Sequence, residues 1–526
     1  MKKNYPVCIL TAGFGTGMGR DYSCINKTLL PLGNESIITN IIRGFPKKTE
    51  FVIALGHLSK QVEDFLGIAH PKTKFTFVYV DNYKGKNSGP GYSLWCCKKH
   101  LNQPFYFVAS DTIFQSFSSP PTNANWAGVA YVPPKLRKKY CNFRIHDNRV
   151  IKIVDKKDCD DTHRAFTGFL FIKDFKLFWN GLESKKTIAG ERQISNGLQN
   201  LLKKKSLIAV DGDWKDLGNK NNYQKELANI QEYDFSKKDE FIYFENDKVI
   251  KFFKDENIIH NRVNKANYNK NVFPKITNHV EQFYAYQFIN GKTMYAESDL
   301  SLFKNLLSWL DKSLWKFVNV DNIKMQKLCM GFYYNKTVKR LALLKKKFNE
   351  EPIEVNGIKV QKIQNILKKI DWKSLSQGLP VFMHGDLQLD NIIYDKKKNK
   401  FILLDWRQDF SGETSFGDIY YDLAKLKGGL IMNYDYIKLN LLYYQSNKNK
   451  VTVDFARRSN SDLYLDLLDD FIRKKSYDIE KINILVGLIY LNMSPLHHSP
   501  FDKALYSLSL LHLSKEIYKK NKFIKI

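Results

Sequence analysis

The sequence lacks long apolar runs and paired cysteines, and each absence removes a class of protein. No stretch of about eighteen apolar residues occurs along the chain, so no membrane-spanning helix is expected. Glycines interrupt the first apolar run at once, so no signal peptide is expected. The 7 cysteines form no C-x-x-C pair, which predicts reduced thiols in a cytoplasmic protein and not a disulfide framework or a zinc site.

Positive charge, in contrast, is in large excess, with a formal net charge of +29. Such a field attracts polyanions, among them nucleotides, nucleic acids and acidic membrane surfaces. The lysines are scattered, with only short clusters such as Lys203–Lys205 and Lys345–Lys347, and no clustered basic-aromatic motif occurs. A solvated lysine-rich surface is therefore predicted, with no nucleic-acid partner. A nucleic-acid-modifying transferase is kept as an alternative, and homo-oligomer formation is left open.

The chain of 526 residues is too long for a single core, and its length alone suggests about three domains. A hydrophobic content of 43% is that of a globular protein. The polar, charged stretch Gln231–Glu240 is the best boundary, so we expect one domain at 1–230 and a second at 238–526.

A glycine-rich segment follows the first expected strand, Val7–Leu10. It reads Thr11-Ala-Gly-Phe-Gly-Thr-Gly-Met-Gly19, and the element K-x-L-x-P begins downstream at Lys27. Glycines at this place let backbone N–H groups approach a triphosphate, and the lysine adds positive charge. The glycines alone could equally form a plain turn.

Together these two elements resemble the signature of the sugar-phosphate nucleotidyltransferases. The resemblance implies an α/β domain with a Rossmann-like mixed sheet and gives Lys27 a catalytic role. The implied nucleotide-binding residues of this loop are Ala12, Gly13, Gly15 and Thr16. The arginine of the family signature is Gly17 in this sequence, and Arg20 is the candidate to replace its contact with the leaving pyrophosphate.

Further elements of the same family follow in order along the first domain. Gly89 opens a loop like the one that lies against the nucleotide base, although a plain turn is the alternative. Asp111 ends the apolar run Phe105–Ser110, at the usual ligand edge of an α/β sheet. By resemblance, Asp111 and Asp216 of a W-x-D-x-G element bind Mg²⁺. Lys156, in an E-K-like segment, would bind the phosphate of the acceptor, unless it is one surface lysine among many.

The second half contains His384-Gly-Asp-Leu-Gln-Leu-Asp-Asn391, followed by the apolar run Phe401–Leu404 and Asp405. Phosphoryl transfer needs a base-like carboxylate near the accepting hydroxyl and oxygen ligands for Mg²⁺. This pattern resembles the catalytic segment of the aminoglycoside phosphotransferase and choline kinase family. The resemblance implies that Asp386 is the catalytic base, that Asn391 and Asp405 hold Mg²⁺, and that His384 braces the loop.

The same resemblance implies an α+β, bilobal, protein-kinase-like phosphotransferase domain, with a small lobe at about 238–292 and a helical large lobe at about 293–526. Lys251, in the expected strand Lys248–Phe253, would contact the ATP phosphates, with an edge-strand lysine as the alternative. Gln287 and Ile289 lie in a segment like the lobe connection, where the backbone binds adenine. Residues 426–526 are expected to be helical, and Asp422 is expected to be a structural anchor.

The two halves fit consecutive chemical steps, because a kinase makes a phosphate ester and a nucleotidyltransferase consumes one. We therefore expect ATP-dependent phosphorylation of a small alcohol, followed by condensation of its phosphate with CTP or UTP for surface glycan synthesis. A sugar or polyol is the preferred acceptor. Choline or ethanolamine, activated with CTP, is one alternative, and a kinase-like binding module without catalysis is another.

Overall fold

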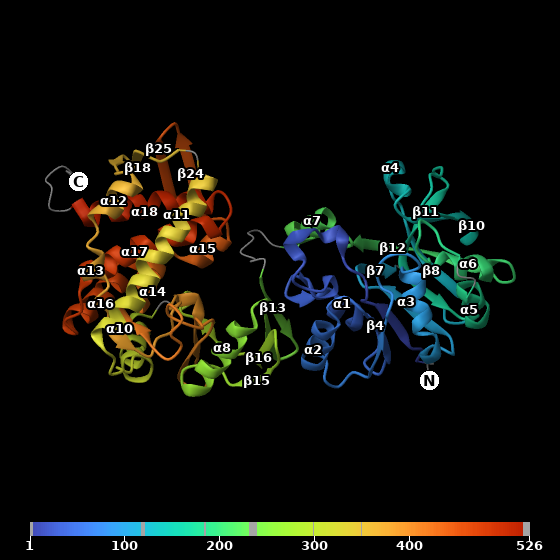
Figure 1. Ribbon diagram of the computed structural model, residues 1–526, viewed down its shortest axis with the longest axis horizontal. Coiled ribbons are helices and arrows are strands. Elements are labelled where there is room, and N and C mark those ends of the chain that lie inside the picture. The colour runs from blue at the N-terminus through green and yellow to red at the C-terminus, as the bar shows by residue number, and fades with distance from the viewer. Residues whose placement is uncertain are drawn as a thin grey trace. The chain divides into compact units, whose positions relative to one another are not determined.

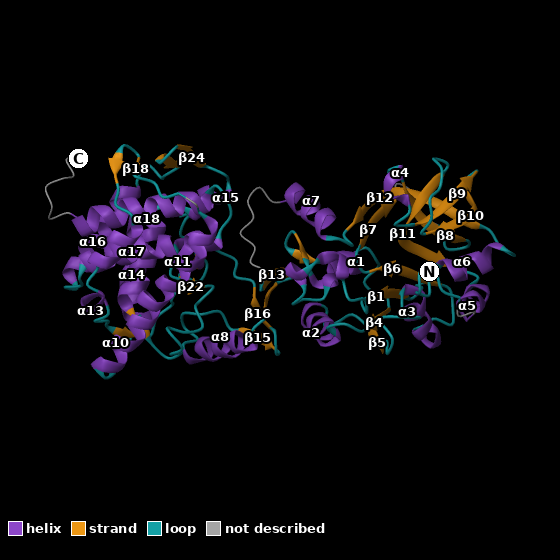
Figure 2. Cartoon of the chain, turned by 45° about the horizontal axis from the view of Figure 1, so that its top comes forward, coloured by secondary structure: helices purple, strands orange, loops and turns teal. Residues whose placement is uncertain are grey.

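The computed structural model describes residues 4–116, 121–183, 186–230, 239–297, 299–348 and 350–518. These residues divide into two compact units (Figure 1). The first contains the described residues of Met1–Gln231, Ser236–Lys254 and Gln282–Ala285. The second contains those of Asp255–Glu281 and Tyr286–Ile526. Strands gather in the first unit, and helices make up most of the second (Figure 2).

The strands of the first unit up to residue 216 are β1 (Val7–Leu10), β2 (Pro31–Leu32), β3 (Glu35–Ser36), β4 (Phe51–Leu55), β5 (Phe75–Tyr79), β6 (Phe105–Ala109), β7 (Thr112–Ser116), β8 (Asn125–Ala130), β9 (Cys141–His146), β10 (Arg149–Asp155), β11 (His163–Ile172) and β12 (Leu207–Asp216). Its large sheet has the order β5-β4-β1-β6-β11-β8-β12-β10-β9. The strands from β5 to β6 pair in parallel, whereas β11 is antiparallel to both of its neighbours. The mixed sheet predicted for this part of the chain is confirmed.

The helices of the first unit are α1 (Ile37–Arg43), α2 (Ser59–Ala69), α3 (Pro90–Cys96), α4 (Pro134–Arg137), α5 (Phe175–Glu183), α6 (Ser195–Leu202) and α7 (Lys220–Ile230). Three of them, α3, α5 and α6, pack against one another. Leu94 of α3, Phe178 of α5 and Leu198 of α6 are fully buried in one cluster with the apolar residues of the sheet. Burial of these side chains holds the sheet rigid beneath its loops.

A hairpin of β13 (Glu240–Glu245) and β14 (Lys248–Phe253) also belongs to the first unit. The Tyr243 hydroxyl donates to the Leu29 carbonyl at 2.7 Å, and Arg43 pairs with the buried Glu245 at 3.3 Å. These contacts group the hairpin with the first unit, although the sequence pattern assigns 238–292 to a single lobe of the second domain. The structure therefore divides that segment between the two units.

The helices of the second unit are α8 (Glu256–Tyr268), α9 (Leu300–Trp309), α10 (Asn322–Met330), α11 (Lys336–Lys347), α12 (Ile363–Lys369), α13 (Trp372–Leu375), α14 (Ile419–Ile431), α15 (Tyr434–Lys438), α16 (Ser461–Lys474), α17 (Ile479–Met493) and α18 (Phe501–Tyr518). The core of this unit forms where α17 packs against α14 and α18. No helix in the described part of the chain is long and apolar enough to cross a membrane.

The remaining strands are β15 (Ile276–His279), β16 (Phe283–Gln287), β17 (Lys292–Thr293), β18 (Glu354–Val355), β19 (Ile358–Lys359), β20 (Pro380–Val381), β21 (Ile392–Asp395), β22 (Lys400–Leu403), β23 (Gly417–Asp418), β24 (Leu442–Asn447) and β25 (Lys450–Phe455). The hairpin of β24 and β25 corrects the expectation that residues 426–526 are helical throughout. Val451 and Val453 alternate with exposed residues and are buried, and β25 pairs with β18. Alternation of this kind favours a strand with one covered face.

Candidate active sites

Two carboxylates meet at one end of the large sheet of the first unit. Asp216 is the last residue of β12 and pairs across the ladder with Thr112 of β7, so it lies beside Asp111. The Leu217 N–H donates to the Asp111 carbonyl at 2.9 Å and fixes this register. A methyl group added at Gly218 would lie 3.0 Å from Asp111 Oδ2 and 3.1 Å from Asp216 Oδ1. Both carboxylates therefore face the same small space.

The two acids have different polar partners. Lys27 Nζ lies 2.6 Å from Asp111 Oδ2. Asp216 Oδ2 accepts hydrogen bonds from the Tyr140 hydroxyl at 2.7 Å and from Asn222 Nδ2 at 3.0 Å. Burial, followed by the bond to Asp216, raises the pKa of Tyr140, which therefore remains a donor. Asp216 is held in one orientation by these bonds, and Lys27 neutralises part of the charge on Asp111.

The glycine-rich loop leads directly to this pair. Asn26 Nδ2 donates to the Thr11 carbonyl at 3.0 Å, which ties the segment that begins at Lys27 to the start of the loop. Gly15 adopts a left-handed φ of 66°, and a methyl group there would lie 3.6 Å from Lys27 Cβ. Of the predicted nucleotide-binding residues, Ala12 is buried, Gly15 is half-buried, and Gly13 and Thr16 are exposed.

Gly17 has a structural reason to be glycine. A Cβ at this position would lie 2.6 Å from the Gly218 carbonyl oxygen, which is closer than real Cβ contacts come. Gly218 lies two residues after Asp216, and the carboxylates of Asp111 and Asp216 both lie close to it. A side chain at position 17 would therefore displace the turn that places these two acids. The backbone geometry therefore disfavours any side chain at position 17.

We expect Gly17→Ala to destabilise the first unit by about 1–3 kcal/mol, the usual cost of overpacking. Urea unfolding followed by hydrogen exchange of first-unit peptides measures this change. Gly67→Ala is the matched control, because a Cβ on that exposed glycine of α2 meets nothing within 4 Å. Equal stability of the two variants would show that the loop adapts without cost.

The other predicted residues of the first unit lie in two places. Lys156 has a left-handed φ of 52° and pairs with Glu191 at 3.1 Å. Gly89, with a φ of 109°, precedes α3 as its N-cap residue. A Cβ added at Gly89 would lie 2.7 Å from the Arg192 carbonyl oxygen, so the two backbones pass close together. The adjacent residues Glu191 and Arg192 thus connect the Gly89 loop with Lys156. Arg20 is exposed in a 3-10 turn.

In the second unit, buried hydrogen bonds hold the predicted catalytic loop. Asp422 of α14 accepts the backbone N–H groups of His384 at 2.8 Å and Gly385 at 2.7 Å. Trp315 Nε1 also donates to Asp422, at 3.1 Å. Burial raises the pKa of Asp422, and the backbone N–H bonds oppose that rise. These bonds give Asp422 the anchoring role expected from the sequence.

His384 joins the loop to the strand that precedes Asp405. The Asp386 N–H donates to His384 Nδ1 at 3.1 Å, so the other ring nitrogen, Nε2, donates to the Leu404 carbonyl at 2.8 Å. Burial lowers the pKa of His384 to about 3 from its usual 6.5. A neutral imidazole is the form that makes both bonds.

We expect His384→Gln to lower the free energy of unfolding at pH 7.5 by about 1–3 kcal/mol, because two buried backbone groups lose a partner. The folded-state pKa lies below the unfolded one, so the native contribution of His384 is complete above pH 6.5 and is lost as the pH falls toward 3. The difference in free energy of unfolding between wild type and variant should therefore decrease as the pH falls from 6.5 to 4, as measured by denaturant titration. A constant difference would indicate that the pKa of His384 is the same in the folded and the unfolded chain.

Asp386 forms an ion pair that the sequence pattern did not predict. Lys425 Nζ of α14 lies 2.5 Å from Asp386 Oδ1, and the lysine is 7% exposed. Burial alone would lower the pKa of Lys425, but the Asp386 carboxylate outweighs burial and the pKa is raised. Lys425 is thus a buried, permanent cation beside the predicted catalytic base.

Asn391 and Asp405 are brought to the same loop by backbone bonds. Asn391 Nδ2 donates to the Asp386 carbonyl at 2.9 Å, and the Leu404 N–H donates to the Asn391 carbonyl at 2.7 Å. Asp405 has a left-handed φ of 57°, and Arg262 Nη1 lies 3.5 Å from its Oδ1. Positive φ at a non-glycine residue is uncommon and concentrates at functional sites.

The three remaining predicted residues lie apart in the sequence from this loop. Lys251 lies in β14 with its side chain buried, and it belongs to the first unit. Gln287 ends β16 and is exposed, and Ile289 follows it and is half-buried. Both belong to the second unit.

Both acid sets suit a hard cation. Asp111 and Asp216 present carboxylate oxygens to one space, and Asn391 and Asp405 offer an amide and a carboxylate oxygen on segments joined by a backbone bond. Mg²⁺ prefers oxygens of these kinds. No cluster of three or more histidine, cysteine, aspartate or glutamate side chains is placed to bind a metal within the described ranges. The arrangement fits a metal that completes its coordination with phosphate oxygens and water, as Mg²⁺–nucleotide complexes do.

The family comparison finds one domain. The model of the phosphotransferase enzyme family matches residues 336–437. The matched span lies in the second unit and contains Asp386, Asn391, Asp405 and Lys425. No curated protein matches the chain.

Solved structures similar to the chain correspond to less than half of it. An apo UDP-glucose pyrophosphorylase is 19% identical and covers 43% of this chain and 97% of its own, with a TM-score of 0.37. A putative glucose-1-phosphate thymidylyltransferase from Bacillus anthracis is 19% identical and covers 44% of this chain and 98% of its own, with a TM-score of 0.37. The inositol-1-phosphate CTP transferase from T. maritima is 14% identical and covers 43% of this chain and 96% of its own, with a TM-score of 0.35.

Proposed function

We propose that the chain is a bifunctional transferase that phosphorylates a small polar alcohol with ATP and then joins the new phosphate to CTP or UTP. The observation that carries the proposal is that each unit has its own set of candidate oxygen ligands for Mg²⁺. One set is Asp111 with Asp216, and the other is Asn391 with Asp405 beside Asp386. A nucleoside triphosphate with Mg²⁺ needs such a set at each of two successive steps.

In the second unit, the side chains accept a proton from the acceptor alcohol and hold the reacting groups in position. Asp386 accepts the proton of the acceptor hydroxyl while that oxygen bonds to the γ-phosphorus of ATP and the bond to ADP breaks. Lys425 balances the charge of the Asp386 carboxylate at 2.5 Å, and Asp422 with His384 fixes the loop. Asn391 and Asp405 would hold Mg²⁺, which neutralises charge on the phosphates.

In the first unit, the phosphate ester attacks the α-phosphorus of CTP or UTP, and pyrophosphate leaves. Asp111 and Asp216 would hold Mg²⁺, and Lys27 beside Asp111 faces developing negative charge. Backbone N–H groups of the loop from Ala12 to Thr16 would bind the triphosphate, and Lys156 would bind the acceptor phosphate. Positioning and charge neutralisation supply most of the rate, because the protein forms no covalent bond. The product is an activated donor of the kind used for surface glycans.

The full-length chain tests this proposal when it is given ATP, CTP, UTP, Mg²⁺ and a panel of sugars, polyols, choline and ethanolamine. We expect an ATP-dependent phosphate ester and then pyrophosphate with a nucleoside-diphosphate conjugate, identified by mass spectrometry. Release of pyrophosphate only from externally supplied phosphate esters would overturn the coupled function.

A further inference from the structure

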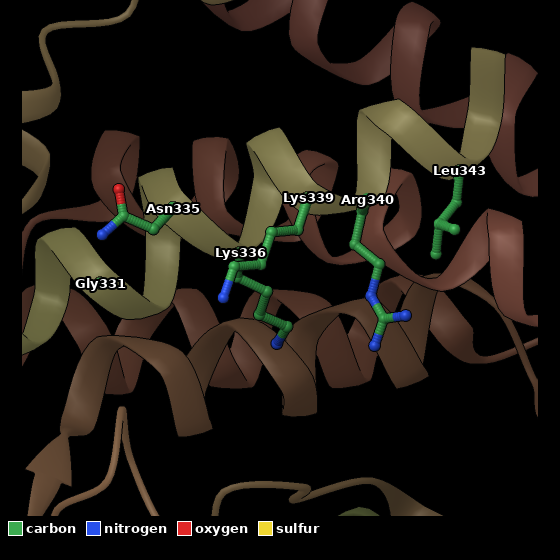
Figure 3. Close-up of a pocket in the computed structure, with 6 residues that line it drawn as sticks. All are labelled: Gly331, Asn335, Lys336, Lys339, Arg340 and Leu343. Carbon is green, nitrogen blue, oxygen red and sulfur yellow. The ribbon is translucent and has the colours of Figure 1, made fainter.

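A basic hollow lies on α11 in the second unit. It has a volume of about 350 Å³ and is lined by Gly331, Asn335, Lys336, Lys339, Arg340 and Leu343. The side chains of Lys336, Lys339 and Arg340 extend from the same side of the helix into it (Figure 3). A π-helical turn, Gly331–Asn335, leads into α11, and such turns are frequent at functional sites.

Aromatic rings join this hollow to the catalytic loop. Lys336 Nζ lies 4.1 Å from the centre of the Phe332 ring, and the Arg407 guanidinium carbon lies 4.9 Å from the same centre. Lys336 Nζ is also 5.4 Å from the Tyr421 ring of α14, the helix that carries Lys425. Arg407 in turn donates its backbone N–H to the His384 carbonyl at 2.9 Å. These contacts link the hollow to the loop that carries Asp386, and the Asp386 charge acts on Lys336.

Within the described ranges, no carboxylate forms an ion pair with Lys336, Arg340 or Arg407, and Arg407 Nε is buried without a hydrogen-bond partner. Burial, and then repulsion from Arg407, Lys425 and Arg340, lowers the pKa of Lys336 well below its usual value, and attraction from Asp386 only partly opposes this. Burial and Arg407 lower the pKa of Arg340 as well. Grouped like charges of this kind cost free energy unless an anion joins them.

We propose that the acceptor of the phosphotransferase site is an alcohol that carries its own anionic group, a carboxylate or a phosphate. Lys336, Arg340 and Arg407 bind that group, while the hydroxyl lies toward Asp386. This inference rests on the proposed function and names its substrate class. A guanidinium fork recognises both oxyanions in the same way. Choline and ethanolamine would meet repulsion from the same three cations.

The competing occupant of these cations is the ATP phosphate chain, and steady-state kinetics separates the two. The full-length chain is assayed for ADP release with Mg²⁺–ATP and a matched panel, in which glycerol is the neutral alcohol, glycerate carries a carboxylate, glycerol 3-phosphate carries a phosphate and choline is cationic. We expect kcat/KM for at least one anionic alcohol to exceed that for glycerol and for choline by about 10- to 100-fold, the range for a charge-assisted bond. Glycerate and glycerol 3-phosphate distinguish the two anion types.

The variant Arg340→Gln tests whether the anionic group of the acceptor binds to Lys336, Arg340 and Arg407. We expect the variant to raise the KM for the anionic alcohol about tenfold or more and to leave kcat and the KM for ATP unchanged. Arg340→Lys should recover part of the loss, because it keeps the charge without the fork. Lys345→Gln, an exposed residue of the same helix, is the control and should behave as wild type. An increase in the KM for ATP alone would place the nucleotide, and not the acceptor, on these cations and would overturn the inference.

Binding measurements separate failure of this inference from failure of the proposed function. Isothermal titration of glycerate and glycerol 3-phosphate into the wild type and Arg340→Gln requires no catalysis. Binding to the wild type that Arg340→Gln weakens, without phosphorylation of any alcohol, would refute the kinase function and keep the anion site. Phosphorylation of glycerol or choline as efficient as that of the anionic alcohols would overturn the inference and keep the kinase.

Discussion

Replacing Asp386 with asparagine is expected to reduce ATP-dependent phosphorylation of the acceptor alcohol by about 10²- to 10⁴-fold, the usual contribution of a positioned general base. Asparagine retains the size and the backbone bonds of the loop but cannot accept a proton. Release of pyrophosphate from an externally supplied phosphate ester, which is assigned to the first unit, should remain at the wild-type rate. Coupled assays for ADP and for pyrophosphate measure the two activities in one preparation.

Loss of the Asp386 carboxylate also leaves Lys425 as a buried cation without its partner. We expect some loss of stability, but less than the about 3–5 kcal/mol of a fully buried pair, because the Asp386 side chain is 39% exposed. The double variant Asp386→Asn/Lys425→Met should regain stability without regaining phosphorylation. If activity returned together with stability, Asp386 would be a structural partner of Lys425 and not a base. Asp454→Asn on the exposed face of β25 is the neutral control.

Local patterns in the sequence predicted the elements that carry the two sites. β1 and β14 run from Val7 to Leu10 and from Lys248 to Phe253, as expected. A continuous apolar run favours the first strand, and β-branched and aromatic residues favour the second. The hairpin at 442–455 was missed. Its alternation is short, and its pairing with β18 depends on a segment nearly a hundred residues earlier, at Glu354–Val355. Such a tertiary contact is not contained in local propensity.

In the two sites as well, the sequence predicted the residues of local motifs but not the partners that contact them from distant elements. Each predicted acid could be recognised because its motif is local, but Asp111 and Asp216 lie together only because β7 pairs with the distant β12. Lys425, Tyr140 and Asn222 were not predicted, since their roles arise only when distant elements meet the acids. Asn222 had a weak signal in its closeness to Asp216 along the chain. Gly17 was interpreted as a departure from a family signature, and the backbone contact with Gly218 disfavours any side chain there.

Replacing Asp216 with asparagine is expected to reduce pyrophosphate release by at least about 100-fold, comparable to losing one preorganised electrostatic contact to the reacting phosphates. Asp216 Oδ1 and Asp111 Oδ2 face one space, so either asparagine variant removes a charge from it. The Mg²⁺ concentration that gives half-maximal activity should rise as well, because an amide binds the ion more weakly than a carboxylate. Phosphorylation by the second unit should not change.

The partners of the two acids predict different secondary effects. Asp111→Asn releases Lys27 from its 2.6 Å ion pair, whereas Asp216→Asn retains an amide oxygen that can still accept from Tyr140 and Asn222. We therefore expect Asp111→Asn to alter the salt dependence of triphosphate binding more than Asp216→Asn does. Asp213→Asn, exposed on the same strand β12, is the matched control and should keep full activity. If Asp213→Asn and Asp216→Asn lost activity equally, the effect would belong to the strand as a whole and the assignment of a metal pair would fail.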